Sequence, residues 1–305
     1  MIQTRPYEFM ASYTPQREWI EKRGALLWFA FFFIELGAGM FIVSSISGSV
    51  AGMLVGWLIC ALLGGGFHLL FLGKPLRFWR MVFSSGWQTS WISRGLIFVI
   101  LFLALGLAQL GLTQMGLTSR LNPVSPILIF TKIFAFVFAF LTVVYGGFAM
   151  NYVNGIPLWN TALLPILYVI SGLWGGAELT LGVFLNRGDI VAGIAVEEAI
   201  RWLLIGFVLL IPVYLMSVRY TSLTGKASVR YMVLNKWRLL FWIVVVVLGM
   251  AVPLAVVFNS FIIGLEASPV VFLYAAIFFG LLGDLSMRYL ILRCGLYSPL
   301  IPVSG

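Results

Sequence analysis

His68 is the only histidine in the chain, and it lies near the end of a long apolar run. The short segment that follows is basic and aromatic, with Lys74, Arg77 and Arg80 interleaved with Phe78 and Trp79. An imidazole titrates near neutral pH, so it can exchange protons as well as form hydrogen bonds. This combination suits a site for an amphipathic redox molecule at a membrane face. We expect the three cations to dock a soluble partner electrostatically.

Polar residues inside other apolar runs extend this candidate site. An ionisable group at bilayer depth is costly and is by default a functional hypothesis. Glu35 lies near the middle of the first run, and no basic residue lies within one helical turn of it. Further polar residues lie toward the same membrane face as His68: Arg94, Tyr145, Asn151, Trp159 and Asn160. We predict that these side chains line one pocket that opens toward that face.

A second polar set lies deeper or toward the opposite face. It comprises Lys132, Glu178, Glu197, Glu198 and Arg201, with Asp284 between the two sets in depth. One hypothesis is a proton path made of Glu35, Lys132, Glu178, Glu197, Glu198 and Asp284. The alternative is local ion pairing along single helices. Glu197 and Glu198 both precede Arg201 by about one helical turn, and Asp284 precedes Arg288 in the same way.

The elements that must hold these residues are transmembrane helices. The chain has 305 residues, of which 62% are hydrophobic and 10% charged, and its mean hydropathy is +1.06. A soluble domain would carry about 25% charged residues. Repeated apolar runs of about 20 residues predict helices that cross a bilayer, and the short alternating segments of a β-barrel are not visible. The predicted fold class is an all-α integral membrane protein.

Eight transmembrane helices are expected in one membrane domain. They are predicted at residues 24–46, 48–72, 91–113, 126–150, 157–184, 193–218, 238–260 and 268–292. A polar N-terminal arm (1–23), in which we expect no secretory signal, precedes this domain (24–293), and a short tail (294–305) follows it. The loops are short, so neighbouring helices should form antiparallel hairpins.

The basic residues are distributed unequally between the two membrane faces. If the face that holds the N-terminus is called side A, all but four of the 19 basic residues lie on side A. The four on the opposite face, side B, are Arg120, Lys132, Arg187 and Arg201. The positive-inside rule then puts side A, with both termini, in the cytoplasm, and the protein in the inner (cytoplasmic) membrane. These loops explain the net charge of +9, which therefore does not indicate nucleic acid.

We expect neither haem nor a metal held by this chain alone. A single histidine cannot supply the two axial ligands of a bis-histidine haem. Cys60 and Cys294 are far apart in the sequence, and no CxxC pair is present, so no zinc or iron–sulfur ligand set is expected. Electrons for any redox chemistry would have to come from a cluster in another subunit.

Four segments carry a resemblance to a known family. They are H-L-L-F-L-G-K-P-L-R-F-W (68–79), S-W-I-S-R-G (90–95), Y-G-G (145–147) and G-I-P-L-W-N-T-A-L-L-P-I-L-Y-V-I-S-G (155–172). Together they resemble the NrfD/PsrC family, the membrane anchor subunits of polysulfide-reductase-type enzymes, and S-W-I-S-R also resembles the related DMSO-reductase anchor. The likeness is clearest over residues 24–184, and the later spans follow by position and count.

This resemblance implies a haem-free, eight-helix subunit that binds a quinone, either menaquinone or ubiquinone. The implied partners are a ferredoxin-like iron–sulfur subunit with four clusters and a molybdopterin catalytic subunit, so the chain would not be catalytically complete alone. The family's quinone pocket is built from the first helices and the Tyr-Gly-Gly helix. Carried onto this sequence, it points to His68, Tyr145 and the polar residues on the same membrane face, and Glu35 is our candidate from the first span.

Two functional hypotheses follow. In the first, a quinone is bound by His68 and Tyr145, Glu35 relays protons, and an anaerobic respiratory complex supplies or takes the electrons. In the second, the chain is a proton- or ion-coupled transporter whose side B carboxylates bind a cation. Co-purification separates them, because the first requires an iron–sulfur subunit, whereas the second requires transport by the isolated chain in liposomes.

Overall fold

The computed structural model describes residues 19–83, 88, 90–114 and 126–298. Most of the N-terminal arm (1–23) and part of the C-terminal tail (294–305) lie outside these ranges. Within them, eight helical segments are long and apolar enough to cross a membrane, which confirms the predicted fold class and span count.

In the described residues, the eight spans are built from twelve helical elements. The first is α1 (Ala25–Ile46), preceded by the short η2 (Lys22–Gly24), and the second joins α2 (Val50–Leu58), the π-helical η3 (Ile59–Gly64) and α3 (Gly65–Phe71). The next four are α5 (Trp91–Gln114), α7 (Pro126–Asn151), α8 (Leu163–Arg187) and α9 (Ile190–Thr221). The seventh joins the π-helical η6 (Leu240–Ala251) to α11 (Val252–Ile263), and the eighth is α12 (Val270–Cys294).

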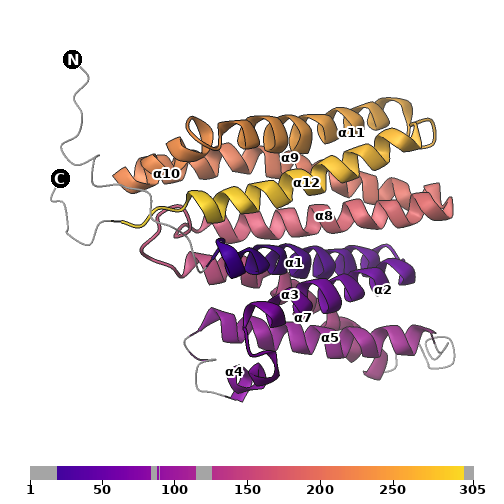
Figure 1. Cartoon of the computed structure of the whole chain (residues 1–305). Helices are drawn as coiled ribbons and strands as arrows, with labels where there is room; N and C mark the ends of the chain where they lie inside the picture. Colours follow the sequence, from indigo (N-terminus) through magenta and orange to yellow (C-terminus); the bar gives the residue numbers. More distant parts are fainter. Residues whose placement is uncertain (1–18, 84–87, 89, 115–125, 299–305) are drawn as a thin grey trace.

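Three shorter helices lie at the membrane face that holds the described N-terminal residues, side A. They are η4 (Pro75–Arg77), α4 (Trp79–Phe83) and α10 (Leu223–Val233). Figure 1 shows α4 and α10 at the same end of the bundle, with α10 beside the end of α12 and α4 on the other side of α1. The sequence did not predict α10, because it is too short and too polar to be read as a span.

The fifth span begins later than predicted. We expected a helix from residue 157, but α8 begins at Leu163. Between α7 and α8 the chain forms successive turns, in which the backbone N–H of Trp159 donates to Ile156 O at 2.9 Å and that of Leu164 donates to Thr161 O at 3.1 Å. These turns satisfy backbone groups at the end of the bundle without continuing the helix.

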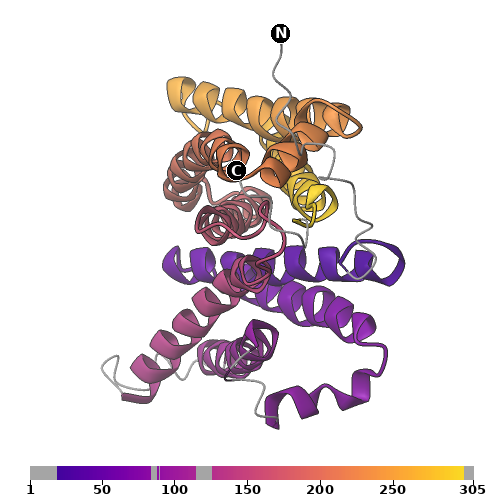
Figure 2. The same ribbon diagram turned by 90° about the vertical axis from the view of Figure 1, so that its left-hand side faces the viewer.

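Helix α1 occupies the middle of the molecule. Both views show it between a group that contains α2, α5 and α7 and a group that contains α8, α9, α11 and α12 (Figures 1 and 2). Glycines let its backbone approach both groups closely. A Cβ on Gly39 would lie 2.0 Å from Gly172 O in α8, and one on Gly37 would lie 2.6 Å from Gly56 O in α2. Such contacts between small residues hold helices together in lipid, where apolar burial gives little drive.

Candidate functional site

A cavity of about 490 Å³ lies near side A, between α1, α3, α4, α5 and α7. Its walls are mainly apolar and include Leu27, Phe31, Ile34, Leu69, Leu72, Ile92, Leu96, Val99 and Leu103. Two polar side chains, His68 and Tyr145, also line it. The cavity therefore offers a large apolar surface with one polar contact point.

His68 and Tyr145 form a hydrogen bond within this cavity. His68 Nε2 lies 2.9 Å from Tyr145 Oη, and His68 Nδ1 lies 3.1 Å from Gly64 O. A carbonyl oxygen can only accept, so Nδ1 carries a proton, and this contact assigns the tautomer. In the neutral ring Nε2 is therefore an acceptor, and the Tyr145 hydroxyl donates to it.

The local structure around the pair positions both rings. His68 follows the π-helical η3, and π-helical turns are frequently found at functional sites. Gly95 makes room for the phenol ring, since a Cβ at that position would lie 2.0 Å from Tyr145 Cδ2. Phe31 packs on both groups, with ring centroids 5.6 Å from His68 and 5.7 Å from Tyr145.

Basic and apolar side chains surround the mouth of the cavity. Phe78 and Met81, from the segment that holds η4 and α4, line the cavity itself. The predicted docking residues Lys74, Arg77 and Arg80 are all exposed on this segment. Leu76 between them is 88% exposed, and Trp79 is also exposed. This segment therefore presents an exposed surface beside the cavity that is both apolar and positively charged.

Behind the cavity, deeper in the bundle, Glu35 belongs to a sealed polar network. Arg288 Nη1 lies 2.6 Å from Glu35 Oε2, its Nε lies 3.0 Å from Asp284 Oδ2, and its Nη2 donates to Ser171 Oγ at 2.5 Å. Glu35 is fully buried, and Asp284 and Arg288 are nearly so. The Arg288 guanidinium also lies 4.5 Å from the centroid of the Tyr168 ring, a cation–π distance.

This network differs from the expected local ion pair of Asp284 and Arg288. The local pair is present, but Arg288 also reaches Glu35, which is 253 residues away in the sequence. Arg288 is consequently a member of the internal network and not one of the side A loop cations. With two carboxylates and one guanidinium, the group carries a net charge of −1 when all three are ionised, so one extra proton would make it neutral.

Glu35 also lies close to the cavity. Its Oε1 atom forms no hydrogen bond to the described residues. The same atom packs against Gly146, where a Cβ would lie 2.0 Å from it. Gly146 directly follows Tyr145, so the free carboxylate oxygen lies behind the backbone that carries the Tyr145 ring.

The other residues predicted for the pocket lie outside its lining, as far as the structure describes it. Arg94 donates to Gln88 O, and its guanidinium lies 5.0 Å from the Trp91 ring centroid. The Trp159 indole is fully buried and donates to Ile291 O at 2.7 Å. Asn160 is exposed and donates to Asn151 O at 2.7 Å. Trp159 and the two asparagines thus stabilise turns and helix ends on side A.

Within the described part of the chain, the side B residues do not form the continuous proton path that was predicted. Glu197 pairs with Arg201 at 2.6 Å, whereas Glu198 is exposed. Lys132 is exposed on the outer surface of α7, so it does not join the internal network. Glu178 is buried and packs against Gly280 of α12, one turn from Asp284, because a Cβ on Gly280 would lie 2.3 Å from Glu178 Oε1. Of the predicted path, only Glu35, Asp284 and Glu178 come together.

Sequence reasoning missed several residues that build the site. Gly95, Gly146 and Ser171 make room for or contact the functional side chains, and Phe31 packs on the polar pair. Small residues carry no chemical signal, and their importance follows from which helices meet. The glycine beside Tyr145 could have been noticed within the Y-G-G segment.

Comparison with known proteins gives a consistent result. Residues 21–299 match the family described as polysulphide reductase, NrfD, so the match includes all eight spans. A curated relative, Protein NrfD homolog of Haemophilus influenzae, is 21% identical over 247 residues, and the alignment covers 75% of each chain. The match extends beyond residues 24–184, where the sequence motifs are clearest.

Proposed function

Because the chain belongs to the polysulphide reductase NrfD family, we propose that it is the membrane anchor and quinone-reactive subunit of a multi-subunit oxidoreductase. It exchanges electrons between a menaquinone or ubiquinone pool and an iron–sulfur subunit, which serves a molybdopterin-type catalytic subunit. The observation that carries this proposal is the His68–Tyr145 hydrogen bond at the wall of an otherwise apolar cavity.

The cavity fits a quinone in size and chemistry. Its volume of about 490 Å³ lies in the range of small-molecule sites. The leucine, isoleucine and phenylalanine side chains of the walls suit an isoprenoid tail and a planar ring, whereas His68 and Tyr145 suit a carbonyl oxygen. A quinone supplies the two-electron, two-proton chemistry when it is bound.

The two polar side chains can handle a proton without breaking their own contacts. His68 Nδ1 stays bonded to Gly64 O, so a proton that arrives is held at Nε2. Protonation reverses the hydrogen bond, because Nε2–H then donates to the Tyr145 oxygen. The Tyr145 O–H is then free to turn and donate into the cavity. The pair therefore links the protonation of His68 to a hydrogen-bond donor that faces the ligand.

We assign the proton relay behind the cavity to Glu35. Its free Oε1 atom packs against Gly146, next to Tyr145, and its other oxygen is held by Arg288. A carboxyl group with one fixed and one free oxygen can take up or release a proton while it keeps its position. Asp284 and Glu178 lie further along α12 and α8 and extend this group inward.

The partner subunit is expected at the mouth of the cavity. Lys74, Arg77 and Arg80 give this surface a positive charge, which suits an acidic iron–sulfur protein. The excess of basic residues on side A favours a cytoplasmic location for this surface in an inner membrane. A cluster docked there would lie close to the cavity.

The test is quinol-linked turnover in the purified complex. His68→Ala and Tyr145→Phe should each abolish turnover with quinol, while the complex still assembles and artificial dyes still reduce the catalytic subunit. Tyr214→Phe is the matched control, because Tyr214 is also fully buried but donates to Leu158 O outside the cavity. Full quinol turnover in both cavity variants would show that the site lies elsewhere.

The transporter alternative is tested by purification under mild detergent. The quinone proposal requires an iron–sulfur subunit to co-purify with the chain. A chain that purifies alone and moves protons or cations in sealed liposomes would favour transport. The Glu197–Arg201 pair weakens that alternative, because the carboxylate is already neutralised by its own helix.

A further inference from the structure

The walls of the His68 cavity differ in exposure from one side to the other. The wall residues of α1 and α7 are buried, and the side chains of Phe31 and Tyr145 are each 2% exposed. The walls that α3 and α5 provide include open side chains, with Leu69 37% and Ile92 42% exposed. The cavity is therefore closed toward the middle of the bundle and open between α3 and α5.

We call this opening the lateral window. Leu69 and Leu72, at the end of the second span, lie on one side of it, and Ile92 and Ile100 of α5 lie on the other. All four side chains line the cavity and are exposed. Leu70, next to Leu69, is also exposed but lies outside the cavity lining, on a helix that crosses the membrane. The window therefore opens sideways, toward the lipid.

The deep end of the window is closed by a contact between the second and third spans. Trp57 Nε1 of α2 donates to Leu103 O of α5 at 2.9 Å, and a Cβ on Gly106 would lie 3.2 Å from Trp57 Cδ1. From Leu103 to Ile92, α5 rises by about 16 Å toward side A. The two spans are thus tied deep in the bundle and separated by the cavity closer to side A.

The surroundings of the window are apolar and partly unfilled. Residues 50–73 and 95–114, which form its two sides, contain no Asp, Glu, Lys or Arg. Gly65 of α3 lines the cavity, and a Cβ there would meet only Cys60 O, at 3.6 Å. A hydrocarbon chain can therefore lie between α3 and α5 without meeting a charge.

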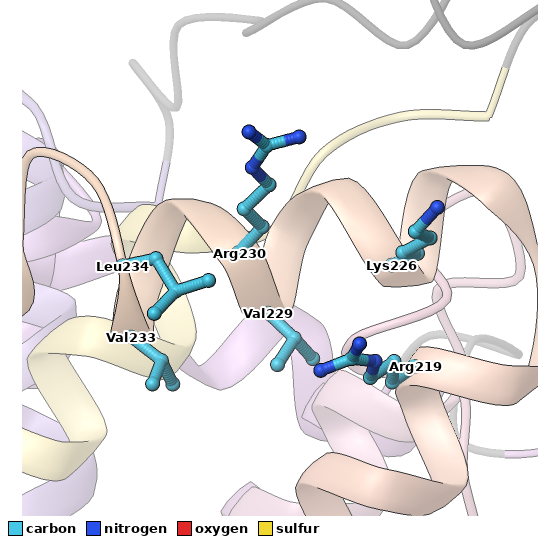
Figure 3. Close-up of a pocket in the computed structure, with 6 residues that line it drawn as sticks. All are labelled: Arg219, Lys226, Val229, Arg230, Val233 and Leu234. Atoms are coloured by element: carbon cyan, nitrogen blue, oxygen red, sulfur yellow. The ribbon is translucent and has the colours of Figure 1, made fainter. Parts of the chain in front are cut away.

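A second hollow at side A does not lead to the same cavity. It lies where α10 follows α9, and as the structure describes it, none of its lining residues lines the cavity: Arg219, Lys226, Val229, Arg230, Val233 and Leu234. Figure 3 shows Arg219 beneath α10 and Lys226 and Arg230 on its upper side. This charged hollow does not suit an isoprenoid chain, and the proposed partner would cover the side A mouth of the cavity.

We propose that the lateral window is the route by which a long-chain quinone enters from the bilayer. The ring reaches His68 and Tyr145, and the isoprenoid tail stays between α3 and α5. Leu69, Ile92 and Ile100 become buried against the tail, which favours a substrate with a long tail over one without it. This inference rests on the proposed quinone function and adds the direction of entry and the preference for a tail.

The test is turnover of the purified complex with two quinols. One is a long-chain menaquinol, and the other is menadiol, which has the same ring and no tail; for a complex that uses ubiquinol, the corresponding ubiquinol pair takes their place. Ile100→Trp narrows the window from α5. It should lower the ratio of kcat/KM for the long-chain quinol to that for the tail-less quinol by about tenfold.

Leu107→Trp is the matched control for Ile100→Trp. Leu107 lies on the same face of α5, two turns further from side A and beyond the Trp57 contact. Its side chain is also exposed but lies outside the cavity lining. The ratio should stay within about twofold of the wild type.

A second pair of variants tests the window from α3. Gly65→Leu places a side chain in the cavity, and it should also lower the ratio about tenfold. Gly66→Leu is its control, because Gly66 is outside the lining and a Cβ there would meet nothing within 4 Å. The control should keep the ratio within about twofold.

The possible outcomes separate this inference from the function on which it rests. An unchanged ratio in Ile100→Trp and Gly65→Leu, together with loss of turnover in His68→Ala, would overturn the window but keep the quinone site. An equal fall of the ratio in the two control variants would also overturn the window. Undiminished turnover with both quinols in His68→Ala would overturn the quinone site and the window together.

Discussion

The helical bundle holds two polar groups in different surroundings. His68 and Tyr145 lie at the wall of a cavity and are bonded mainly to each other. Glu35, Asp284 and Arg288 are sealed between α1, α8 and α12 and are neutralised largely within the group. The first group has hydrogen-bonding capacity left for a ligand, whereas the second mainly holds helices from the two halves of the chain together.

The sealed polar residues should therefore contribute mainly to stability, and the polar residues at the cavity mainly to ligand binding. A buried charge is tolerated only with its partners, so removal of one partner should destabilise the fold. A polar pair beside a cavity can lose one member at small cost to stability but at large cost to ligand binding. Stability should therefore respond most to loss of the Arg288 cation, and turnover most to changes at His68, Tyr145 and the Glu35 carboxyl group.

The largest effect on stability is expected at Arg288. Arg288→Leu leaves Glu35 and Asp284 buried without their cation, which should destabilise the protein by about 3–5 kcal/mol. The melting temperature of the purified protein measures this loss. Arg238→Leu, an exposed cation, is the control and should change little. Equal stability of the two variants would mean that the sealed network does not hold the bundle together.

The variant Glu35→Gln distinguishes two roles of Glu35, which are proton transfer and stabilisation of the helical bundle. Gln keeps the shape and leaves Arg288 paired with Asp284, so we expect a change in stability below about 1 kcal/mol. Loss of the proton relay should lower quinol turnover by about 100-fold. Quinol turnover and the melting temperature are measured for the variant and the wild type. A loss of turnover without a loss of melting temperature indicates proton transfer. Undiminished turnover would assign Glu35 to support alone.

Two glycine substitutions extend the comparison to packing. A Cβ on Gly95 would meet the Tyr145 ring at 2.0 Å, and one on Gly146 would meet Glu35 Oε1 at 2.0 Å. Each change to Ala should cost about 1–3 kcal/mol by overpacking, which chemical denaturation measures. Gly66→Ala is the control, because a Cβ on Gly66 would point into open space. A cost at Gly66 as large as that at Gly95 would contradict this explanation.

The smallest effect is expected at Lys132. This exposed cation of α7 lies outside both polar groups, so Lys132→Gln should change stability by less than about 0.5 kcal/mol. Quinol turnover should also be unchanged, and a steady-state assay with the purified complex measures it. A marked loss of turnover would place Lys132 on the proton path after all.

The sequence predicted the fold better than the site. Long apolar runs determine the number of spans, and all eight predicted spans are confirmed, with ends that moved by a few residues. The start of α8 was missed because the apolar turns before Leu163 resemble a continuing helix in composition. The resemblance of the Y-G-G segment to the family predicted that Tyr145 and His68 lie in one pocket. Their hydrogen bond confirms that the two side chains are neighbours.

The partners of a buried charge could not be read from the chain. Glu35 has no cation within a helical turn, and its partner Arg288 is on the last span. Which helices meet depends on backbone packing at glycines such as Gly39, and that information is not local in the sequence. For the same reason Trp159, which shares a motif with the family, was placed in the pocket although its indole caps the carbonyl of Ile291.

The central claim, that the His68–Tyr145 cavity is the quinone site, is tested most directly by photolabelling. An azido-quinone is illuminated in membranes that contain the intact complex, and the labelled peptides are identified by mass spectrometry. We expect labels on the cavity walls, within residues 27–34, 61–72 and 92–103, and their loss when excess native quinone competes. Competed labelling confined to α9, α11 or α12 would contradict the account.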